Sequence, residues 1–329
     1  MRIAVTGGAG FVGRAVVERL HRRGDDVVAL VRDPARAEHL VRDGGGGRGT
    51  VTLVRSSLAD PRVLRDATRN ADAVVHVAGS YRIGIRPSER AAMWDANVGT
   101  TERVLDAAIA ERVPRIVYTS TLNVFGNTRG RIVDETYRRN LADGFLSVYD
   151  ETKFRAHEAA QARIAAGAPI VIVMPSQVYG PHDHSLASQQ LHRAFHGTLA
   201  YRAFGSTGTG WVHVHDLADG IIAAVDQGTV GGSYCVGGPN HRMDDAVAIA
   251  ARVGGRRVPR IVLPTLLARI AAPLNDAVGG LPGMPANLRE TISAGDGVTY
   301  WASHEKATRE LGFEPRSLEQ GILDTWGSH

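Results

Sequence analysis

The chain has 329 residues, of which 43% are hydrophobic and 22% are charged, and its net charge is +4. These values place it among ordinary globular proteins that are long enough to bury a sizeable core. Basic residues are scattered among Asp and Glu without a long basic run, so we expect no nucleic-acid partner.

Short apolar runs alternate with longer helical patterns through the first 175 residues. A run at 2–6 precedes a glycine-rich turn and a pattern with helical spacing at 11–23. Further apolar runs follow at 27–31, 51–54, 73–77, 116–119 and 170–174, and long helical patterns lie at 90–112 and 149–166. Near-continuous apolar strands alternating with helices predict an α/β fold with a doubly wound parallel sheet of the Rossmann type.

The pattern changes after residue 175, where Pro and Gly become denser. Short strands are predicted at 211–214 and 233–236, with a helix at 217–227 between them and Asp216 as its N-cap. Helices are predicted at 246–253, 264–277 and 304–311. We therefore expect a Rossmann domain at 1–175, to which 212–237 return, and a smaller C-terminal substrate-binding region formed by 176–211 and 238–329.

The glycine-rich turn between the first strand and the first helix has the spacing of a dinucleotide site. Gly7 allows the tight turn, Gly10 lets the backbone approach a pyrophosphate, and Gly13 lets the helix pack closely on the sheet. The helix N-terminus, with Phe11 and Val12, supplies N–H donors to the phosphates. This segment predicts that the chain binds NAD or NADP.

The end of the second strand distinguishes the two cofactors. An acidic residue there favours NAD by binding the ribose 2′-hydroxyl. Arg32 stands at this place and can pair with a 2′-phosphate through its guanidinium, with Arg36 as an assistant. NADP is therefore favoured, while Asp33, the next residue, keeps NAD open.

Tyr149 and Lys153 are four residues apart at the start of a helical pattern, so they share one helix face. A free Tyr has a pKa of about 10, and a nearby ammonium lowers it by stabilising the phenolate. Such a pair can move a proton to or from a hydroxyl oxygen while a nicotinamide moves the hydride.

Several further motifs occur in a characteristic order along nearly the whole chain. They are TGGAGFVG at 6–13, HVAG at 76–79, NVGT at 97–100, YTSTLNVFG at 118–126, YDETK at 149–153, MPSQVYGP at 174–181, VHVHD at 212–216 and KATRELGFEP at 306–315. With them the chain resembles the extended short-chain dehydrogenase/reductase family, in its NAD(P)-dependent epimerase/dehydratase branch. It looks most like hopanoid-associated sugar epimerases and dihydroflavonol-4-reductase-like proteins, and the latter also carry VRDP after the second strand.

The resemblance implies a role for each matching residue. Thr121, next to Ser120, holds the substrate oxygen, Tyr149 is the acid/base, and Lys153 tunes Tyr149 and holds the nicotinamide ribose. Asn97 is a structural or relay group. Further cofactor contacts are implied for Ala78, Gly79, Pro175, Ser176 and Val178.

Departures from the family pattern disfavour two of the reactions that members of this family catalyse. Sugar dehydratases place an Asp–Glu pair directly after the catalytic hydroxyl, where this chain has Leu122 and Asn123. Members that epimerise next to a carbonyl use a Cys in this segment, and the single cysteine, Cys235, lies far away in sequence. Sugar dehydration and epimerisation next to a carbonyl are therefore both disfavoured.

The segment that often holds a nucleotide-sugar diphosphate with an Arg is 207–211 here, and it has none. This weakens a nucleotide-sugar substrate, although Arg202, Arg82 or Arg86 can substitute. Simple hydride chemistry remains, so we predict an NADP-dependent reductase or dehydrogenase acting on a carbonyl or secondary alcohol. The alternatives are a sugar epimerase and a non-catalytic dinucleotide sensor.

Composition and spacing also indicate what else to expect. A lone cysteine excludes an intramolecular disulfide and a cysteine zinc site, and His182 and His184 lack a third ligand at a characteristic spacing, so no metal is expected. No signal-peptide layout and no run of about 18 apolar residues occurs, which predicts a cytoplasmic protein without a membrane partner. A homodimer is expected through the helices at 90–112 and 149–166, unless Ala107, Ala108, Ile109, Ala159 and Ala160 pack on the sheet.

Overall fold

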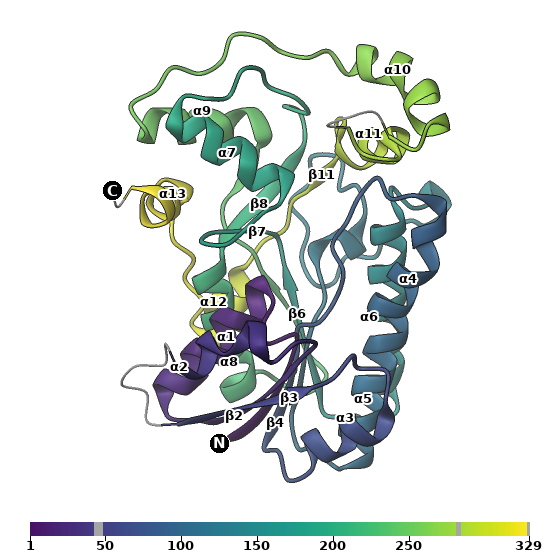
Figure 1. Ribbon diagram of the computed structural model, residues 1–329, viewed down its shortest axis with the longest axis vertical. Helices are drawn as coiled ribbons and strands as arrows, with labels where there is room; N and C mark the ends of the chain where they lie inside the picture. The colour runs from purple at the N-terminus through teal and green to yellow at the C-terminus, as the bar shows by residue number, and fades with distance from the viewer. Residues whose placement is uncertain (43–48, 281–283, 328–329) are drawn as a thin grey trace.

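The computed structural model describes residues 1–42, 49–280 and 284–327, and its largest element is a seven-stranded parallel sheet (Figure 1). The strand order is β3-β2-β1-β4-β5-β6-β9, which is the predicted doubly wound order with one strand added. The strands are β1 (Arg2–Thr6), β2 (Asp26–Val31), β3 (Thr50–Arg55), β4 (Ala73–His76), β5 (Ile116–Thr119), β6 (Ile170–Pro175) and β9 (Ser233–Val236). The sequence-based strands in the first 175 residues are confirmed to within one residue at each end.

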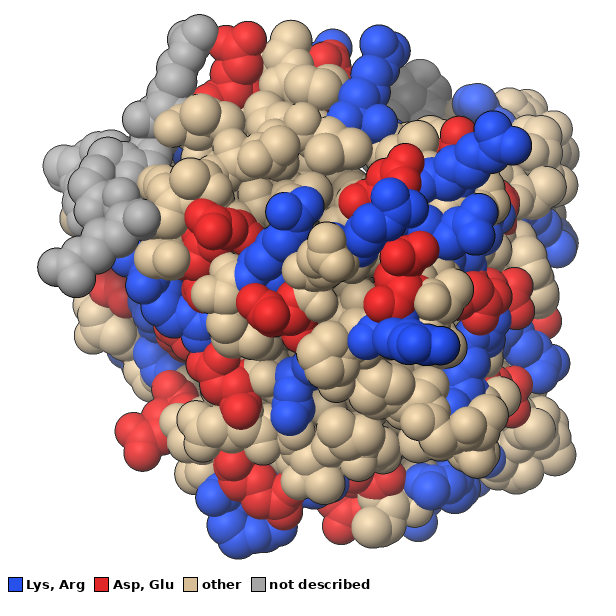
Figure 2. Space-filling model, turned by 90° about the horizontal axis from the view of Figure 1, so that it is seen from below, with Lys and Arg blue, Asp and Glu red and all other residues tan. Residues whose placement is uncertain are grey.

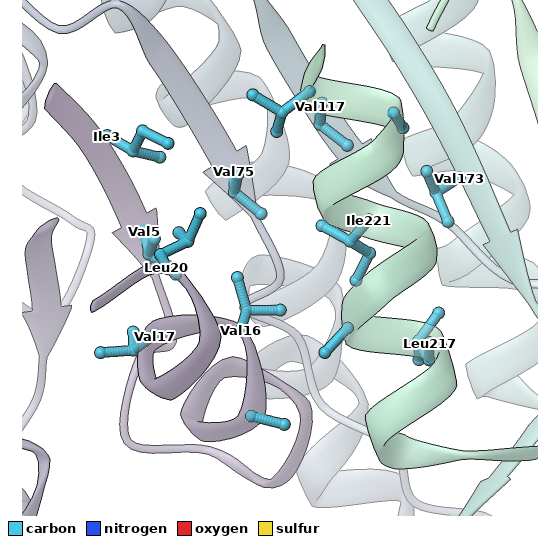
Figure 3. Packing of buried hydrophobic residues seen from close by; sticks show 14 of the residues in the cluster. Ile3, Val5, Val16, Val17, Leu20, Val75, Val117, Val173, Leu217 and Ile221 are labelled. Carbon is cyan, nitrogen blue, oxygen red and sulfur yellow. The ribbon is translucent and has the colours of Figure 1, made fainter. Parts of the chain in front are cut away.

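Helices cover both faces of this sheet (Figure 1). One face carries α1 (Phe11–Arg23), α8 (Val214–Gln227) and α12 (Glu305–Leu311), and the other carries α3 (Pro61–Thr68), α5 (Thr100–Ala110) and α6 (Val148–Ala165). Ile3 and Val5 of β1 pack toward α1 and α8, whereas Ala4 between them packs on the opposite side (Figure 3). This double burial explains why the strands are apolar without alternation.

A second, smaller sheet lies beyond the carboxyl edge of the large one. Its central strand β8 (Gly208–His213) pairs with β7 (Gln177–Tyr179), β10 (Asn240–Arg242) and β11 (Thr299–Tyr300). Three helices pack around it with their own core, namely α7 (Leu186–His196), α9 (Met243–Val253) and α13 (Leu318–Trp326). The chain returns to the large sheet with α8 and β9, and the division into cofactor and substrate regions stays a prediction.

Two further helices, α10 (Thr265–Ala277) and α11 (Leu288–Gly295), pack against each other at one end of the molecule (Figure 1). The short helices α2 (His39–Arg42) and α4 (Arg90–Trp94) complete the helical elements. Among the residues that the structure describes, none of the helices has the length and hydropathy that crossing a bilayer requires.

The N-cap prediction for Asp216 is wrong. The helix begins at Val214, with His213 as N-cap, so Asp216 lies in its first turn. Its carboxylate instead pairs with the guanidinium of Arg316 and accepts the Arg316 backbone N–H at 3.0 Å. This pair joins α8 to the segment before α13, a contact across 100 positions that sequence spacing does not reveal.

The expected dimer helices pack their small residues inward. Ala107, Ala108 and Ala160 are buried against the sheet, as the second alternative expects, whereas Ile109 and Ala159 are only partly buried. On the exposed side, Arg163 of α6 pairs with Asp106 of α5 at 2.7 Å. The homodimer therefore stays a prediction without a residue pattern in its favour.

Candidate active site

The residues that the sequence singled out follow the carboxyl ends of several strands. Because the strands are parallel, these ends meet at one edge of the sheet, where ligands bind in such folds. Gly7 follows β1, Arg32 follows β2, Ala78 and Gly79 follow β4, Ser120 and Thr121 follow β5, and Pro175 ends β6. The structure thus brings the predicted cofactor and catalytic segments to a common edge.

The turn after β1 has the shape of a phosphate cradle. Gly7 has a φ of +70°, and a Cβ there would lie 3.0 Å from the Cα of Ala78. A Cβ on Gly13 would overlap the carbonyl oxygen of Gly7, so the helix can pack here only with glycine. At Gly10 the only atom within 4 Å of a Cβ is that same oxygen, at 3.1 Å, so a methyl group there would project in front of the helix.

The N-terminus of α1 offers unpaired donors at this cradle. The first helical bond runs from Arg14 N to Gly10 O at 2.8 Å, which leaves the N–H groups of Phe11, Val12 and Gly13 without a partner inside the helix. No acidic residue lies in the first turn. The side chains of Phe11 and Val12 pack on the core. The segment therefore fits an anionic diphosphate held by backbone donors.

The side chains of Arg32 and Asp33 differ in whether they bind other groups of the protein. Asp33 accepts the backbone N–H of Ala35 at 3.1 Å and lies 3.4 Å from the Arg36 guanidinium. Arg32 is exposed, and within the described part of the chain it forms no hydrogen bond or ion pair. The guanidinium at the end of β2 is thus free to meet a ligand, whereas the neighbouring carboxylate is held in its own turn.

Tyr149 lies in a closed, mostly apolar corner at the start of α6. It is 8% exposed and packs with Ile85 and Met93. Tyr81 stands edge-on to it, with ring centroids 4.8 Å apart, and is itself half exposed. The Thr121 hydroxyl lies near the Tyr149 phenol and donates to Asn123 Oδ1 at 3.1 Å.

Burial governs the ionisation of Tyr149. It raises the pKa of the phenol above its usual value, and the nearby Tyr81 phenol raises it further, while the Thr121 hydroxyl lowers it. We expected Lys153 to lower this pKa, but in this structure burial dominates. Tyr149 is therefore a neutral phenol at neutral pH and a proton donor.

Lys153 lies one turn further along α6 and is also buried. Its Nζ donates to the Thr119 carbonyl oxygen at 3.0 Å and to the Tyr118 hydroxyl at 3.4 Å. Burial lowers the pKa of Lys153 to about 8. The ammonium is thus held below the strand end by two protein oxygens and remains charged at neutral pH.

Sequence reasoning missed a chain of buried polar side chains behind this pair. His76 joins Thr6 (Nδ1 to Oγ1, 2.7 Å) to Thr101 (Nε2 to Oγ1, 3.0 Å) and stacks on Tyr118. Burial, with a smaller effect of the Lys153 charge, lowers the pKa of His76 to about 3, so it is neutral. Its place at the end of an apolar strand in HVAG was the available signal.

Asn97 lies where the helix predicted at 90–112 departs from regular α-helical geometry. Residues Asp95–Gly99 form a π-helical turn, which interrupts α4 and α5. The Asn97 amide donates to Ser80 O at 3.0 Å and Thr152 Oγ1 at 2.9 Å, and its oxygen accepts Ser80 N–H at 2.7 Å. It therefore fixes the loop after β4 against α6, which is the structural role that the resemblance implied as one option.

The remaining predicted contacts lie where β6 meets the small sheet. The Ser176 hydroxyl accepts the N–H of Gly238 at 3.4 Å, and a Cβ on Gly210 would lie 3.0 Å from its Cβ. Pro175 precedes it as the last residue of β6, and Val178 in β7 packs on the main core.

A family comparison matches residues 3–237 to the NAD dependent epimerase/dehydratase family. The chain belongs to this family. It is an NAD(P)-dependent enzyme with a Rossmann fold, and the resemblance seen in its motifs is confirmed.

Several curated relatives of this epimerase/dehydratase chain are named as reductases. It is 29% identical to a Synechocystis sp. protein named as a candidate dihydroflavonol 4-reductase, covering 97% of this chain and 92% of the relative. It is 28% identical to 2-alkyl-3-oxoalkanoate reductase of Stenotrophomonas maltophilia (98% and 97%). It is 27% identical to a Stigmatella aurantiaca ketoreductase whose named substrate is a farnesyl dihydroquinoline oxide (98% and 95%).

Solved structures of the family share the fold over the whole chain. The structure of gox2253 has a TM-score of 0.79 and 27% identity, covering 99% of this chain and 96% of that one. UDP-glucuronic acid 4-epimerase of Bacillus cereus in complex with NAD has a TM-score of 0.75 at 19% identity, covering 99% and 98%. The second likeness concerns the fold alone.

The arginines that could replace a diphosphate-binding arginine are engaged elsewhere in this epimerase/dehydratase chain. Arg82 pairs with Glu89 at 2.6 Å and Arg202 with Asp244 at 3.1 Å. Arg86 donates to the carbonyl oxygen of Gly279 at 3.4 Å. Each is thus bound to its own protein partner.

The described residues also contain no group of three or more His, Cys, Asp or Glu side chains arranged to hold a metal. Cys235, in β9, is buried, and burial raises the pKa of its thiol well above the usual value. It therefore has the character of a core residue.

Proposed function

We propose that this chain is a reductase that uses NADP(H) to interconvert a lipophilic ketone and its secondary alcohol, with Tyr149 as the acid/base. The observation that carries the proposal is the buried Tyr149 phenol, which lies near Thr121 and packs against Ile85 and Met93. A neutral phenol in an apolar corner can protonate the oxygen of a carbonyl as it is reduced.

Each catalytic side chain has a defined task in this proposal. Thr121 orients the substrate oxygen toward the Tyr149 hydroxyl, and Lys153 stays protonated so that its charge favours the phenolate left after proton transfer. The bound nicotinamide supplies or accepts the hydride. Leu122 and Asn123 follow Thr121 and have no acid or base to offer, so further elimination steps find no residue here.

Preference for NADP follows from the end of β2. A 2′-phosphate needs a cation, and Arg32 is exposed and unpaired in the described part of the chain, whereas Asp33 is held by Ala35 and Arg36. The residues implied to hold the rest of the cofactor are Gly7, Gly10, Phe11, Val12, Gly13, Ala78, Gly79, Tyr149, Lys153, Pro175, Ser176 and Val178.

The substrate class rests on two observations. Apolar side chains surround Tyr149, and the arginines near the substrate side are bound to other protein groups, which disfavours a nucleotide-sugar diphosphate. The names of the alkyl-oxoalkanoate reductase and the farnesyl-quinoline ketoreductase also describe carbonyl compounds with long apolar parts.

The test measures oxidation of NADPH and NADH with medium-chain and long-chain ketones, and with nucleotide sugars, by wild type, Tyr149→Phe and Tyr81→Phe. We expect NADPH oxidation with lipophilic ketones, and a loss of about 10²–10⁴-fold in kcat/KM for Tyr149→Phe. Tyr81→Phe keeps the edge-on ring and is the matched control, with activity within about threefold of wild type.

Two results would replace the proposal. Interconversion of sugar stereoisomers without net NADPH oxidation would establish the epimerase alternative, because an epimerase returns its hydride in each cycle. Tight cofactor binding with full biological activity in Tyr149→Phe would establish a dinucleotide sensor.

A further inference from the structure

The end of the molecule formed by residues 258–278 exposes an unusual amount of apolar surface. Nine of the twenty large apolar side chains that are exposed in the described residues lie in this stretch. We name it the apolar end; its most prominent members are Ile261, Val262, Leu266, Leu267, Ile270 and Leu274. Scattered apolar side chains are normal on a soluble protein, but a contiguous group marks a contact surface.

Helix α10 carries most of this surface in a regular stripe. Leu266, Ile270 and Leu274 recur every four residues and are exposed by 65%, 68% and 66%. Ala272 and Asn275 on the opposite side are buried, and Ala272 packs with Leu288 and Ile292 of α11. A surface helix ordinarily turns its apolar stripe to the core. Here the stripe of large residues points away from it, so the helix has an unpartnered face.

The charge around the apolar end is mostly basic: residues 246–278 carry five arginines and one acidic residue, Asp276. Arg252 pairs with Glu319 and Arg269 with Asp296, whereas exposed Arg257 and Arg260 form no ion pair within the described residues.

The opposite end of the molecule differs. There, basic and acidic side chains are interspersed over the whole visible face (Figure 2). The segment that links α9 to α10 and bears Arg257 and Arg260 runs along the outermost edge of the apolar end (Figure 1). Apolar and unpaired basic side chains therefore occur together at the apolar end.

In contrast to the sequence-based expectation of no membrane partner, we propose that the apolar end docks on a lipid bilayer that contains anionic headgroups. The stripe of α10 enters the boundary between headgroups and acyl chains, and Arg257 and Arg260 meet lipid phosphates. With 13 residues, α10 is about 20 Å long, shorter than the hydrocarbon core of about 30 Å, so it lies on the bilayer rather than across it.

Docking at this end places the active site beside the bilayer. Glu290 of α11 accepts the N–H of Val148 at 2.6 Å, one residue before Tyr149, and Asn287 N–H donates to Gly84 O at 2.9 Å. The α10–α11 pair is thus fastened to the loop and helix that surround Tyr149. The docking itself does not depend on which reaction Tyr149 performs.

The experiment is co-sedimentation of the full chain with vesicles of phosphatidylcholine alone or mixed with phosphatidylglycerol. Two double variants test the two components, L266S/I270S for the apolar stripe and R257E/R260E for the charge. The matched control is R62E/R65E, which reverses two exposed arginines on α3. Thermal unfolding and NADPH binding of each variant verify that it is folded.

We expect wild type and the control to sediment with mixed vesicles and less with phosphatidylcholine alone. Each test variant should lower the partition coefficient at least about tenfold, since R257E/R260E reverses two charges that meet lipid phosphates and L266S/I270S removes two apolar side chains that enter the bilayer. Absence of wild-type binding to mixed vesicles, or equal binding of all variants, overturns the proposal. So does conversion of a dimer to a monomer by L266S/I270S with unchanged vesicle binding, which would make the apolar end a subunit interface.

Discussion

The Lys153 ammonium is held by the Tyr118 hydroxyl, with Nζ and the phenol oxygen 3.4 Å apart. The Thr119 carbonyl oxygen, at 3.0 Å, is its second acceptor. Both come from β5, so the cation on α6 depends on the strand that also leads to Thr121. Because the side chain is buried, its pKa falls to about 8, close to the working range of the enzyme.

This placement predicts an alkaline limit to activity. Above pH 8 the ammonium loses its proton and can no longer favour the Tyr149 phenolate, so kcat/KM should fall about tenfold per pH unit. Tyr118→Phe removes one acceptor of the Lys153 ammonium, which lowers the pKa of Lys153 further and moves the alkaline fall in kcat/KM to lower pH. Lys153→Arg, which stays charged, should move this fall in kcat/KM to higher pH and should reduce the activity. The measurement is a pH profile of kcat/KM with saturating NADPH, and a wild-type profile that is flat well past pH 8 would contradict this role of Lys153.

Cofactor preference supplies the second prediction. Arg32→Ser should reduce kcat/KM with NADPH by at least about tenfold, since a charge-assisted hydrogen bond contributes about 1.5–3 kcal/mol, and should change kcat/KM with NADH little. The control Arg65→Ser removes an exposed arginine on α3 and should leave both values unchanged. Steady-state kinetics with each cofactor measure the effect. An unaltered NADPH-to-NADH ratio in Arg32→Ser would mean that another group selects the cofactor.

Substitutions in the glycine turn are predicted to affect cofactor binding and protein stability differently. A Cβ on Gly10 meets only Gly7 O, at a tight 3.1 Å, so Gly10→Ala should lose less stability than Gly13→Ala but place a methyl group where the diphosphate approaches. A Cβ on Gly13 overlaps Gly7 O, so Gly13→Ala should lower the free energy of unfolding by about 1–3 kcal/mol as well. Urea unfolding and NADPH titration distinguish the two. Wild-type cofactor affinity in Gly10→Ala would show that the cradle lies elsewhere.

The large sheet and the catalytic pair were predictable because their signals are local. Apolar runs such as Ile170–Pro175 identify buried strands, and a spacing of four residues places Tyr149 and Lys153 on one helix face. The small sheet was predictable only in part: its central strand β8 overlaps the strand expected at 211–214, whereas β10 and β11 have three and two residues and exist through pairing with β8. The sequence also did not reveal two side-chain partners that lie far away along the chain. Tyr118 is 35 positions from Lys153, and Arg316 is 100 positions from Asp216.

Buried neutral histidines predict a loss of stability in acid. The pKa of His76 falls to about 3 and that of His157, bonded to Ser120, to about 4, both through burial. Unfolding returns them to about 6.5, so between these values the unfolded chain binds protons that the folded chain does not. Stability therefore falls as pH is lowered through this window, by about 1.4 kcal/mol per pH unit for each histidine.

The measurement is the free energy of unfolding in urea from about pH 7 down to about pH 4, where the slope reports the protons taken up. His76→Gln keeps a polar group between Thr6 and Thr101 and should reduce the slope by about one proton, and His157→Gln should do the same independently. Each variant should also be less stable than wild type at neutral pH by about 1–2 kcal/mol, because its hydrogen bonds are imperfect. If the slopes of both variants equal that of wild type, the acid sensitivity arises from carboxylates rather than from these buried imidazoles.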